Sequence, residues 1–270
     1  MGIRINTNIS SLNTQRHLSR NSSFFRKSME KLSSGLRINR AGDDAAGLAI
    51  SEGLKADIRA LDQASRNAAD GISMVQVAEG AMDEVSAILL RMKELAEQSA
   101  NGTLSDTDRG YLDSEYTALS SEIDRIAAGT EFNGISLLDG TGGTVNLQVG
   151  IASGGSNVVA VDLGTARTAS DLGIAAGIDD VTNSNTAMGE IDTAIENVAT
   201  ARASFGAIQN RLETSIRNID MTSENLSAAN SRIRDVDIAK ETANMTSYQI
   251  LQQAGVSMLA QANMTTGMAM

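Results

Sequence analysis

Residues 191–236 read IDTAIENVATARASFGAIQNRLETSIRNIDMTSENLSAANSRIRDV, and the spacing of their apolar residues decides the fold. One row repeats every seven positions, at Ile191, Val198, Phe205, Leu212, Ile219, Leu226 and Ile233. A companion row, three residues further on, runs from Ala194 to Val236 and consists mostly of small residues. Apolar residues at alternating steps of three and four form one stripe along a helix, as in coiled coils.

The helical pattern extends well beyond this stretch. Gly206 is the only glycine between Glu190 and Ala254, and the chain has no proline, so the sequence predicts one unbroken helix there. At a rise of about 1.5 Å per residue, such a helix would be on the order of 100 Å long. A compact domain of this chain length has a radius of gyration of only about 18 Å. The pattern therefore predicts a mainly α-helical, elongated molecule.

Two segments of the first half also have helical spacing. One runs from Leu54 to Ala96 and the other from Leu112 to Ile126, and Ser105 and Asp108 have the spacing of an N-terminal capping pair before the latter. Their stripes find comparable stripes only in the second half, so we expect an antiparallel helical rod, or coiled coil, formed by the two halves. The residues expected to pack this rod are Leu54, Ile58, Leu61, Ile72, Leu212, Ile219 and Leu226.

Residues 130–182 differ in composition from the helical segments. Glycine is frequent there, and apolar residues alternate with polar ones at Val145, Leu147 and Val149, which is typical of a half-buried strand. Val158 and Val161 indicate a second strand, and residues 139–143 (DGTGG) predict a turn. We therefore expect a small β-hairpin region with loops, packed on the rod.

The composition argues against an active site. Aromatic residues, which line most ligand pockets, make up only 3% of the chain, cysteine is absent, and His17 is the single histidine. No phosphate-binding glycine motif occurs. Asp106 with Asp108 fits a helix start, and Asp235 with Asp237 is expected in the middle of a helix with both side chains in solvent. No catalytic residue, metal site or cofactor is therefore expected.

The charge distribution is uneven. The net charge of −11 argues against nucleic-acid binding, whereas residues 1–45 carry eight Lys/Arg against three acidic residues. This asymmetry indicates either electrostatic complementarity between neighbouring subunits or simply solvated helix faces. No stretch of 18 apolar residues is present, and Met1–Leu12 contains no apolar run of secretory type, so neither membrane insertion nor an ordinary signal peptide is expected.

Several sequence blocks resemble the bacterial flagellins. The N-terminal blocks are Arg4–Leu12 (RINTNISSL), Leu32–Arg40 (LSSGLRINR) and Ala41–Ser51 (AGDDAAGLAIS). The C-terminal blocks are Arg202–Arg211 (RASFGAIQNR), Ser223–Thr242 (SENLSAANSRIRDVDIAKET) and Gln252–Asn263. They occur in the family's order and cover nearly the whole chain outside 141–185. The chain resembles a short flagellin without variable outer domains.

The resemblance implies a structural subunit that polymerises into the flagellar filament. Residues 1–44 and 230–270 would be disordered in the monomer and fold on assembly, and residues 45–229 would form a helical rod domain that includes the β region. The chain ends carry apolar stripes that we expect to be buried by other copies. The residues expected in this self-assembly are Leu12, Leu18, Phe25, Leu32, Leu36, Ile233, Val236, Ile250, Leu251, Met258 and Leu259.

The resemblance also implies partners and a location. Export would proceed through the flagellar type III apparatus without a cleaved signal, helped by a chaperone that binds the C-terminal segment. The product would be an extracellular filament that meets hook-associated and cap proteins. The last residues depart from the family pattern, and Gly267 among them is expected to shorten the last helix.

Arg91, Leu95 and Glu115 match the central positions at which flagellins contact the vertebrate Toll-like receptor 5. Leu90 stands where those flagellins usually have Gln. The competing interpretation, which the sequence favours, is that this surface serves packing between subunits only.

Two other functions compete with a filament subunit. A hook–filament junction protein would share the paired terminal helices but would be present in few copies, whereas a flagellin should dominate sheared filaments. An enzyme or binding module on a coiled-coil scaffold would need a concave apolar pocket with converging polar groups, which the scarcity of aromatic residues and histidine argues against.

Overall fold

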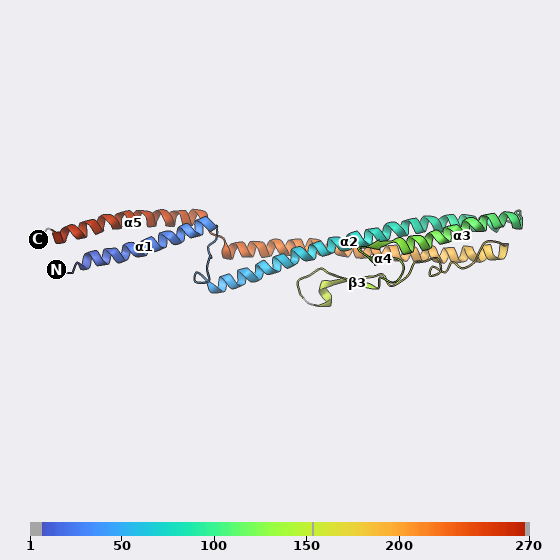
Figure 1. The fold of residues 1–270 in the computed structure, drawn as a ribbon, viewed down its shortest axis with the longest axis horizontal. Coiled ribbons are helices and arrows are strands. Elements are labelled where there is room, and N and C mark those ends of the chain that lie inside the picture. Colours follow the sequence, from blue (N-terminus) through green and yellow to red (C-terminus); the bar gives the residue numbers. More distant parts are fainter. Residues whose placement is uncertain (1–6, 153, 268–270) are drawn as a thin grey trace. The chain divides into compact units, whose positions relative to one another are not determined.

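The computed structural model describes residues 7–152 and 154–267 and is mainly α-helical, as predicted (Figure 1). Its α-helices are α1 (Ile9–Ser34), α2 (Ala45–Ser99), α3 (Asp106–Gly129), α4 (Val181–Arg234) and α5 (Ile238–Gly267). The strands are β1 (Glu131–Phe132), β2 (Ile135–Ser136), β3 (Thr144–Gln148) and β4 (Val158–Asp162), with a 3-10 turn at Gly155–Asn157.

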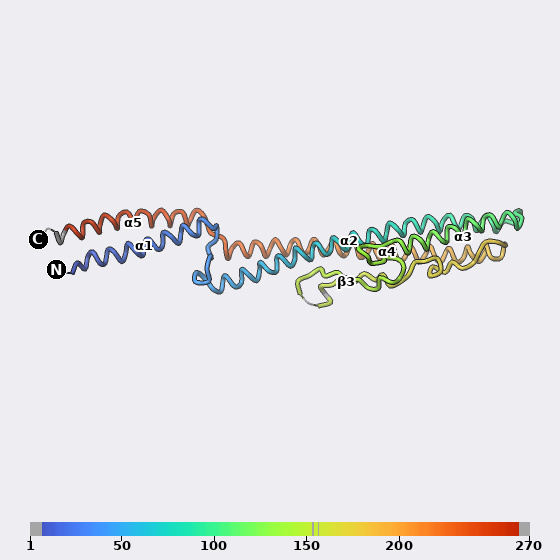
Figure 2. The backbone as a smooth tube through the Cα atoms, viewed as in Figure 1, coloured from blue at the N-terminus to red at the C-terminus, as the bar shows by residue number. Residues whose placement is uncertain are grey.

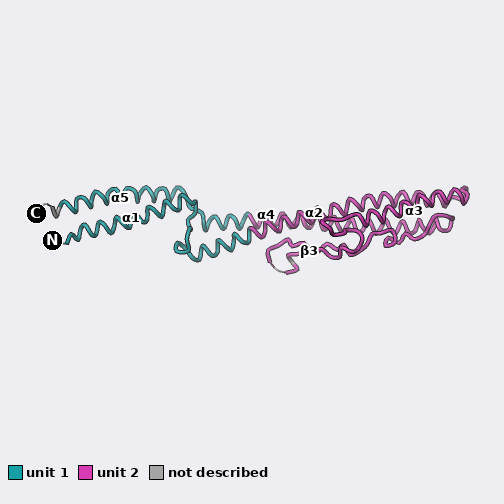
Figure 3. Tube along the Cα trace, in the orientation of Figure 1, with its two compact units in different colours: residues 1–58, 224–270 teal, residues 59–223 magenta. Residues whose placement is uncertain are grey.

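The chain divides into two compact units, which Figure 3 distinguishes by colour. The terminal unit consists of residues 1–58 and 224–270, and the central unit consists of residues 59–223. The domain division expected from the family resemblance, at 44/45 and 229/230, concerns which parts fold on assembly, so it remains a prediction.

The helices of the central unit pack antiparallel. Lys93 Nζ lies 2.5 Å from Asp192 Oδ1, and Arg202 Nη1 lies 2.8 Å from Asp83 Oδ1, so residue numbers rise along α2 as they fall along α4. Both contacts join exposed or half-buried side chains, so solvent screens them and they indicate the direction of the pairing more than they stabilise it. The pairing of the two chain halves is therefore antiparallel in this unit, as predicted.

Apolar residues of α2, α3, α4 and the strands form one core in the central unit. The side chains of Leu89, Met92, Ile123 and Ile191 are fully buried there. Among the residues expected to pack the rod, Leu61, Leu212 and Ile219 are buried and Ile72 is half-buried in this unit. Leu54, Ile58 and Leu226 belong to the terminal unit and are half-buried.

A buried arginine holds the connection between α2 and α3. Arg109 is 4% exposed, and its guanidinium donates to the carbonyl oxygens of Asn101 and Leu104, each at 3.1 Å, and to that of Ser99. The predicted capping pair is confirmed, because the amide of Asp108 donates to Ser105 Oγ at 3.3 Å and the amide of Ser105 donates back to Asp108. These bonds satisfy backbone groups that a helix end leaves unpaired.

The predicted hairpin is confirmed as β3 and β4. The strands are antiparallel, and Val145 lies opposite Val161 while Leu147 lies opposite Val159. Asn67 of α2 donates from its side-chain amide to the carbonyl oxygen of Gln148 at 3.1 Å, which fixes the hairpin to the helix. The predicted turn at residues 139–143 is also present and precedes β3.

A second, smaller hairpin, β1–β2, was not predicted. Asn133 and Gly134 connect its strands with φ values of 51° and 77°. Two consecutive positive φ values define a type I′ turn, for which Asn-Gly is the favoured sequence. The dipeptide was therefore a usable signal, although the flanking strands have only two residues each.

The prediction of one unbroken helix through residues 190–254 is wrong, because α4 ends at Arg234 and α5 begins at Ile238. Residues 35–37 pair with the chain at this point. The amide of Val236 donates to the Gly35 carbonyl oxygen at 3.0 Å, and that of Arg37 donates to the Arg234 carbonyl oxygen at 2.6 Å. These bonds use backbone groups that a continuous helix would need.

Asp235 and Asp237 are consequently not in the middle of a helix. Asp235 forms an isolated antiparallel bridge with Leu36. The side chain of Asp237 accepts a hydrogen bond from the amide of Lys240 at 3.1 Å and so caps the start of α5. At the other end of α5, the described helix extends to Gly267. The expected shortening concerns the residues that follow, which lie outside the described part of the chain, and stays a prediction.

We predict that Gly71→Ala destabilises the central unit. A Cβ on Gly71 would overlap Leu147 Cδ1 and would lie 3.3 Å from Leu212 Cδ1, so the hairpin would have to move away from α2. Overpacking of this kind costs about 1–3 kcal/mol. Gly80→Ala is the matched control on the same helix, because nothing lies within 4 Å of its added Cβ. In the control, the free energy of unfolding should rise by up to about 1 kcal/mol, because alanine has the higher helix propensity. Urea unfolding followed by circular dichroism measures the stability of both variants. Equal changes in stability would contradict the close packing of Leu147 against Gly71.

We predict that Tyr116→Phe stabilises the central unit, most strongly at high pH. Tyr116 is 3% exposed, and its hydroxyl forms no hydrogen bond with any residue that the structure describes. Removing such a hydroxyl should gain about 1 kcal/mol. Burial, with smaller effects of Glu190 and Asp113, raises the pKa of Tyr116 to about 12.

The sign of the pH effect follows from this shift. The pKa of Tyr116 in the folded chain lies above its ordinary value. The contribution of this proton equilibrium to the free energy of unfolding is therefore fully present below pH 10 and is lost as the pH rises from about 10 to 12. Tyr116→Phe should flatten this part of the curve in urea unfolding at several pH values. Tyr111→Phe is the control, since Tyr111 is 73% exposed, and an unchanged alkaline slope in Tyr116→Phe would contradict the prediction.

Candidate assembly surface

In the terminal unit, α1 and α5 lie side by side and antiparallel (Figure 2). Polar side chains join them along their length. Asn8 donates to the Ala262 carbonyl oxygen at 2.8 Å, near the chain ends, and Ser28 Oγ donates to Glu241 Oε1 at 2.6 Å, near the other end of the pair. The register of the two helices is therefore fixed by hydrogen bonds between specific residues.

An aromatic pair lies between these polar contacts. The rings of Phe24 and Tyr248 have centroids 5.5 Å apart, and the guanidinium of Arg20 lies 5.6 Å from the centroid of Phe24. Aromatic and cation–π contacts of this geometry each contribute about 0.5–1.5 kcal/mol. They stabilise the pair, but they do not amount to a core.

The terminal unit buries very little apolar surface. Among its described residues, Ile38 is the only hydrophobic residue in the buried class, and the other buried side chains are Ser28 and Ser51. A helical domain normally buries one apolar stripe of each helix. This unit therefore lacks a hydrophobic core within one copy of the chain.

The residues predicted for self-assembly fall into two groups. Four are exposed: Leu12 (52%), Ile250 (59%), Leu251 (48%) and Met258 (62%). The others are half-buried: Leu18, Phe25, Leu32, Leu36, Ile233, Val236 and Leu259. Within one copy, the second group is thus partly covered, whereas the first group is open to a partner.

The sequence analysis missed further exposed apolar residues of this unit. They are Ile9, Phe24, Ile50, Ile238 and Val256. They lie outside the seven-residue rows, so a search for one stripe per helix could not find them. The usable signal was the overall lack of charge in α5.

Helix α5 is uncharged over most of its length and carries apolar side chains in several directions, between uncharged polar ones. Its charged residues are Lys240 and Glu241, and none follows in 242–267. At 100° per residue, Ile250, Leu251 and Val256 point in three different directions. Apolar side chains that point in several directions cannot all be covered by the single neighbouring helix α1. Among the described residues, no helix is long and apolar enough to cross a membrane.

Helix α1 is basic and the central unit is acidic. From Ile9 to Ser34, α1 carries five Lys/Arg and one Glu, whereas the central unit carries 10 Lys/Arg and 24 Asp/Glu. Part of the basic charge is paired locally. Lys27 lies 2.6 Å from Asp43, and this contact holds the pKa of Asp43 below its ordinary value. The remaining basic residues of α1 are available to acidic surfaces.

Of the three residues matched to the receptor contact, Arg91 and Glu115 are exposed and Leu95 is buried. Arg91 pairs with Glu115 at 2.8 Å and with Glu94 at 3.0 Å, all on the surface of the central unit. The hydrogen bonds with Glu115, and then with Glu94, raise the pKa of Arg91. Leu95 is 0% exposed, so its proposed contact with a receptor is wrong for this folded state. Leu90, beside them in sequence, is 54% exposed.

The residues considered for chemistry are dispersed. His17 is an exposed residue of α1. Asp106 is fully exposed at the start of α3, while Asp108 serves in the cap described above. Within the part of the chain that the structure describes, no group of three or more His, Cys, Asp or Glu is arranged to hold a metal ion.

Comparisons with known proteins match both helical regions of the chain to one family. The family model of the bacterial flagellin N-terminal helical region matches residues 5–142, and that of the bacterial flagellin C-terminal helical region matches residues 188–268. The gap between the matches, 143–187, contains β3, β4 and their loops.

Curated relatives match along nearly their full length. A flagellin of Halalkalibacterium halodurans is 53% identical over 262 residues, which cover 96% of this chain and 95% of the relative. A flagellar filament 33 kDa core protein of Treponema phagedenis is 46% identical, with coverage of 97% and 96%. A flagellin of Bacillus subtilis is 44% identical, also with coverage of 97% and 96%.

Solved structures share the fold. The crystal structure of Bacillus cereus flagellin matches with a TM-score of 0.52 and 35% identity, over 61% of this chain and 94% of that one. A Vibrio parahaemolyticus structure described as a flagellar hook-associated protein matches with a TM-score of 0.59, but its 18% identity shows the fold alone. It therefore does not favour the hook–filament alternative over the relatives named above. With both terminal regions matched and relatives similar from end to end, this chain belongs to the bacterial flagellin family.

Proposed function

We propose that this chain is a structural subunit of the bacterial flagellar filament and that its terminal unit completes its hydrophobic core with copies of itself. The observation that carries this proposal is the uncharged stretch 242–267, whose apolar side chains Ile250, Leu251 and Met258 remain exposed although α1 packs beside it. A heterologous contact that does not close on itself produces an open helical polymer. A filament of identical subunits can therefore bury every face of α5.

Ordering of residues 1–44 and 230–270 accompanies this assembly. In one copy, the α1–α5 pair gains hydrogen bonds and one aromatic contact, against a backbone entropy cost of about 1–2 kcal/mol per ordered residue. With Ile38 as its one buried apolar residue among those described, the terminal unit has little burial to offset this cost. Coupled folding and assembly keeps free subunits from aggregating prematurely.

The weak terminal unit also suits export. A segment with few buried contacts unfolds at low free-energy cost, so it can thread through the flagellar type III apparatus without a cleaved signal. An export chaperone would cover the apolar surface of α5 before assembly. The filament would then be extracellular and would end against hook-associated and cap proteins. Toll-like receptor 5 could contact the surface around Arg91 and Glu115, whereas Leu95 has no part in that contact.

The chain acts as a structural element and not as an enzyme. Two of the acidic residues considered above have structural roles: Asp108 lies in a helix cap and Glu115 lies in a surface ion pair. Neither is placed in an apolar cleft beside a nucleophile, which a catalytic pair requires. Its proposed function depends on its shape and on the apolar surface that it buries against other copies.

Seeded elongation tests the proposed function. Purified wild-type chain, added to sheared filament fragments, should extend them, as seen by electron microscopy. A variant that lacks residues 230–270 should stay soluble and partly folded but fail to elongate, because α1 then loses its partner and α5 is absent. Filaments of normal length grown from the truncated chain would show that the assignment of the terminal helices is wrong.

A single substitution on α5 provides a sharper prediction. Leu251 is 48% exposed in one copy, and burying a leucine side chain contributes about 1.5–3 kcal/mol. Leu251→Asn should therefore raise the critical concentration for elongation by about 10- to 100-fold. Leu251→Met, which keeps the apolar character at the same position, is the matched control and should elongate nearly as the wild type does. Normal elongation by Leu251→Asn would place this side chain outside the interface.

A further inference from the structure

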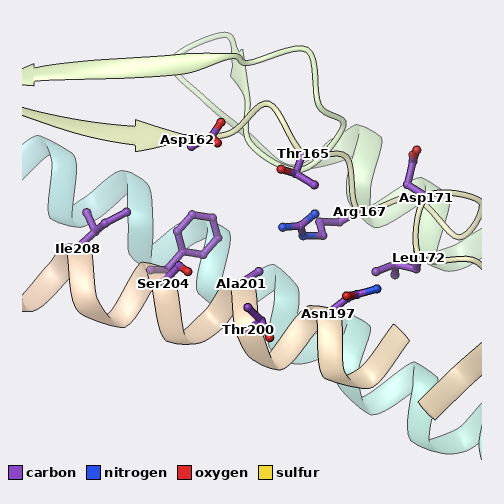
Figure 4. A pocket seen from close by; sticks show the side chains of 11 residues that line it. Asp162, Thr165, Arg167, Asp171, Leu172, Asn197, Thr200, Ala201, Ser204 and Ile208 are labelled. Carbon is purple, nitrogen blue, oxygen red and sulfur yellow. The ribbon is translucent and has the colours of Figure 1, made fainter. Parts of the chain in front are cut away.

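The central unit has a groove between α4 and the loop that follows β4 (Figure 4). Its volume is about 360 Å³. The guanidinium of Arg167 points from the loop into the space above α4, and Asn197 and Ser204 border this space from the helix. Leu172 and Phe205 contribute apolar lining. The groove thus combines one cation with a mixed polar and apolar wall.

Hydrogen bonds on both sides of Arg167 fix the loop that carries it. Its own amide donates to the Leu138 carbonyl oxygen at 2.7 Å, and the amide of Ala169 donates to Asp124 of α3 at 2.8 Å. Ala169 is itself buried in the core. The guanidinium is therefore held at the groove by the fold and does not depend on a flexible surface loop.

The charge of Arg167 is left without a counterion in one copy. Its Nη1 donates to the Ala166 carbonyl oxygen at 3.1 Å, and it forms no ion pair with any residue in 7–152 or 154–267. The side chain is half-buried, and this burial lowers the pKa of Arg167 despite the nearby acids. A guanidinium has five N–H donors, so most of its hydrogen-bonding capacity is unused.

The two acidic residues of the groove are engaged elsewhere. Asp162 accepts a hydrogen bond from the amide of Gly164 at 3.0 Å, and Asp171 accepts one from the hydroxyl of Thr168. Both bonds lie within short turns of the same loop. Each carboxylate therefore has a hydrogen bond within its own turn, and neither forms an ion pair with Arg167 among the described residues.

The chemistry of the groove selects a single carboxylate. A planar guanidinium forms two parallel hydrogen bonds with a carboxylate. Among the described residues that line the groove, Arg167 is the only basic one and Asp162 and Asp171 are acidic, so a multiply charged phosphate group would lack compensation. The central unit itself carries 24 Asp/Glu against 10 Lys/Arg, so another copy presents many carboxylates. We infer that the groove at Arg167 binds an Asp or Glu side chain of a second copy of this chain, an inference that rests on the proposed filament function.

Cross-linking tests this contact directly. In Arg167→Lys, a carbodiimide can join the new amine to a carboxylate that it touches. Filaments grown from a mixture of ¹⁴N- and ¹⁵N-labelled subunits distinguish links between copies from links within one copy by mass spectrometry. We expect mixed-isotope links at position 167 in filaments and none in the dilute monomer. Arg217→Lys is the matched control on α4, because Arg217 is exposed and hydrogen-bonded to Thr214 within one copy.

Elongation gives an independent readout. Arg167→Gln removes the charge at nearly constant size and should raise the critical concentration about tenfold, as the loss of one partner of a half-buried charge pair does. Arg217→Gln should leave it unchanged. Circular dichroism of the monomers checks that each variant folds as the wild type does.

The outcomes separate this contact from the filament function. If wild-type chain elongates while Arg167→Gln elongates equally well and Arg167→Lys gives links only to Asp162 or Asp171, the inference is overturned and the filament function stands. The same holds if phosphate stabilises the wild-type monomer but not Arg167→Gln and no mixed-isotope link forms, since the groove then binds a free anion. Failure of wild-type chain to elongate would overturn both.

Discussion

The apolar surface of the α1–α5 pair cannot be buried inside its own unit, and the rest of the molecule depends on this constraint. Two helices that lie side by side cover one face each, whereas α5 carries exposed apolar side chains in several directions and no charge in 242–267. Each large side chain left exposed forgoes about 1.5–3 kcal/mol. The order of the terminal unit is therefore coupled to what surrounds it.

The central unit, in contrast, has a hydrophobic core within one copy of the chain. Its core draws on three helices and on the strand region, where Leu137, Leu138 and Val161 are each at most 1% exposed. Few aromatic residues take part, of which Tyr116 and Phe205 are buried. Aliphatic side chains of similar width suit thin helix-on-helix packing, and the hairpin covers the side of α2 at which Gly71 leaves room for Leu147.

The seven-residue row predicted which face of α4 is buried, but not what covers it. Ile191, Val198 and Leu212 are at most 1% exposed, whereas Leu226 and Ile233 of the same row are only half-buried. Periodicity is a property of one helix, and burial depends on its neighbours. The end of α4 and the break at 235–237 could not be predicted from periodicity for the same reason. The backbone there is hydrogen-bonded to residues 35–37, which are about two hundred positions away in the sequence. Leu95 shows the limit for sites: a motif match gives a position, and packing decides whether that position faces solvent.

The Arg167 groove could not be read from the sequence either, since an arginine among glycine-rich loop residues has no periodic context. Its significance comes from charge. The central unit has an excess of 14 acidic residues, so neighbouring copies repel one another wherever these surfaces approach. Salt screens exposed charges beyond about 8 Å, but it acts less on partly buried ones. A half-buried guanidinium without a counterion therefore turns part of this repulsion into a directed attraction. On the proposed filament function, the basic residues of α1 would offer acidic surfaces of other copies the same kind of attraction.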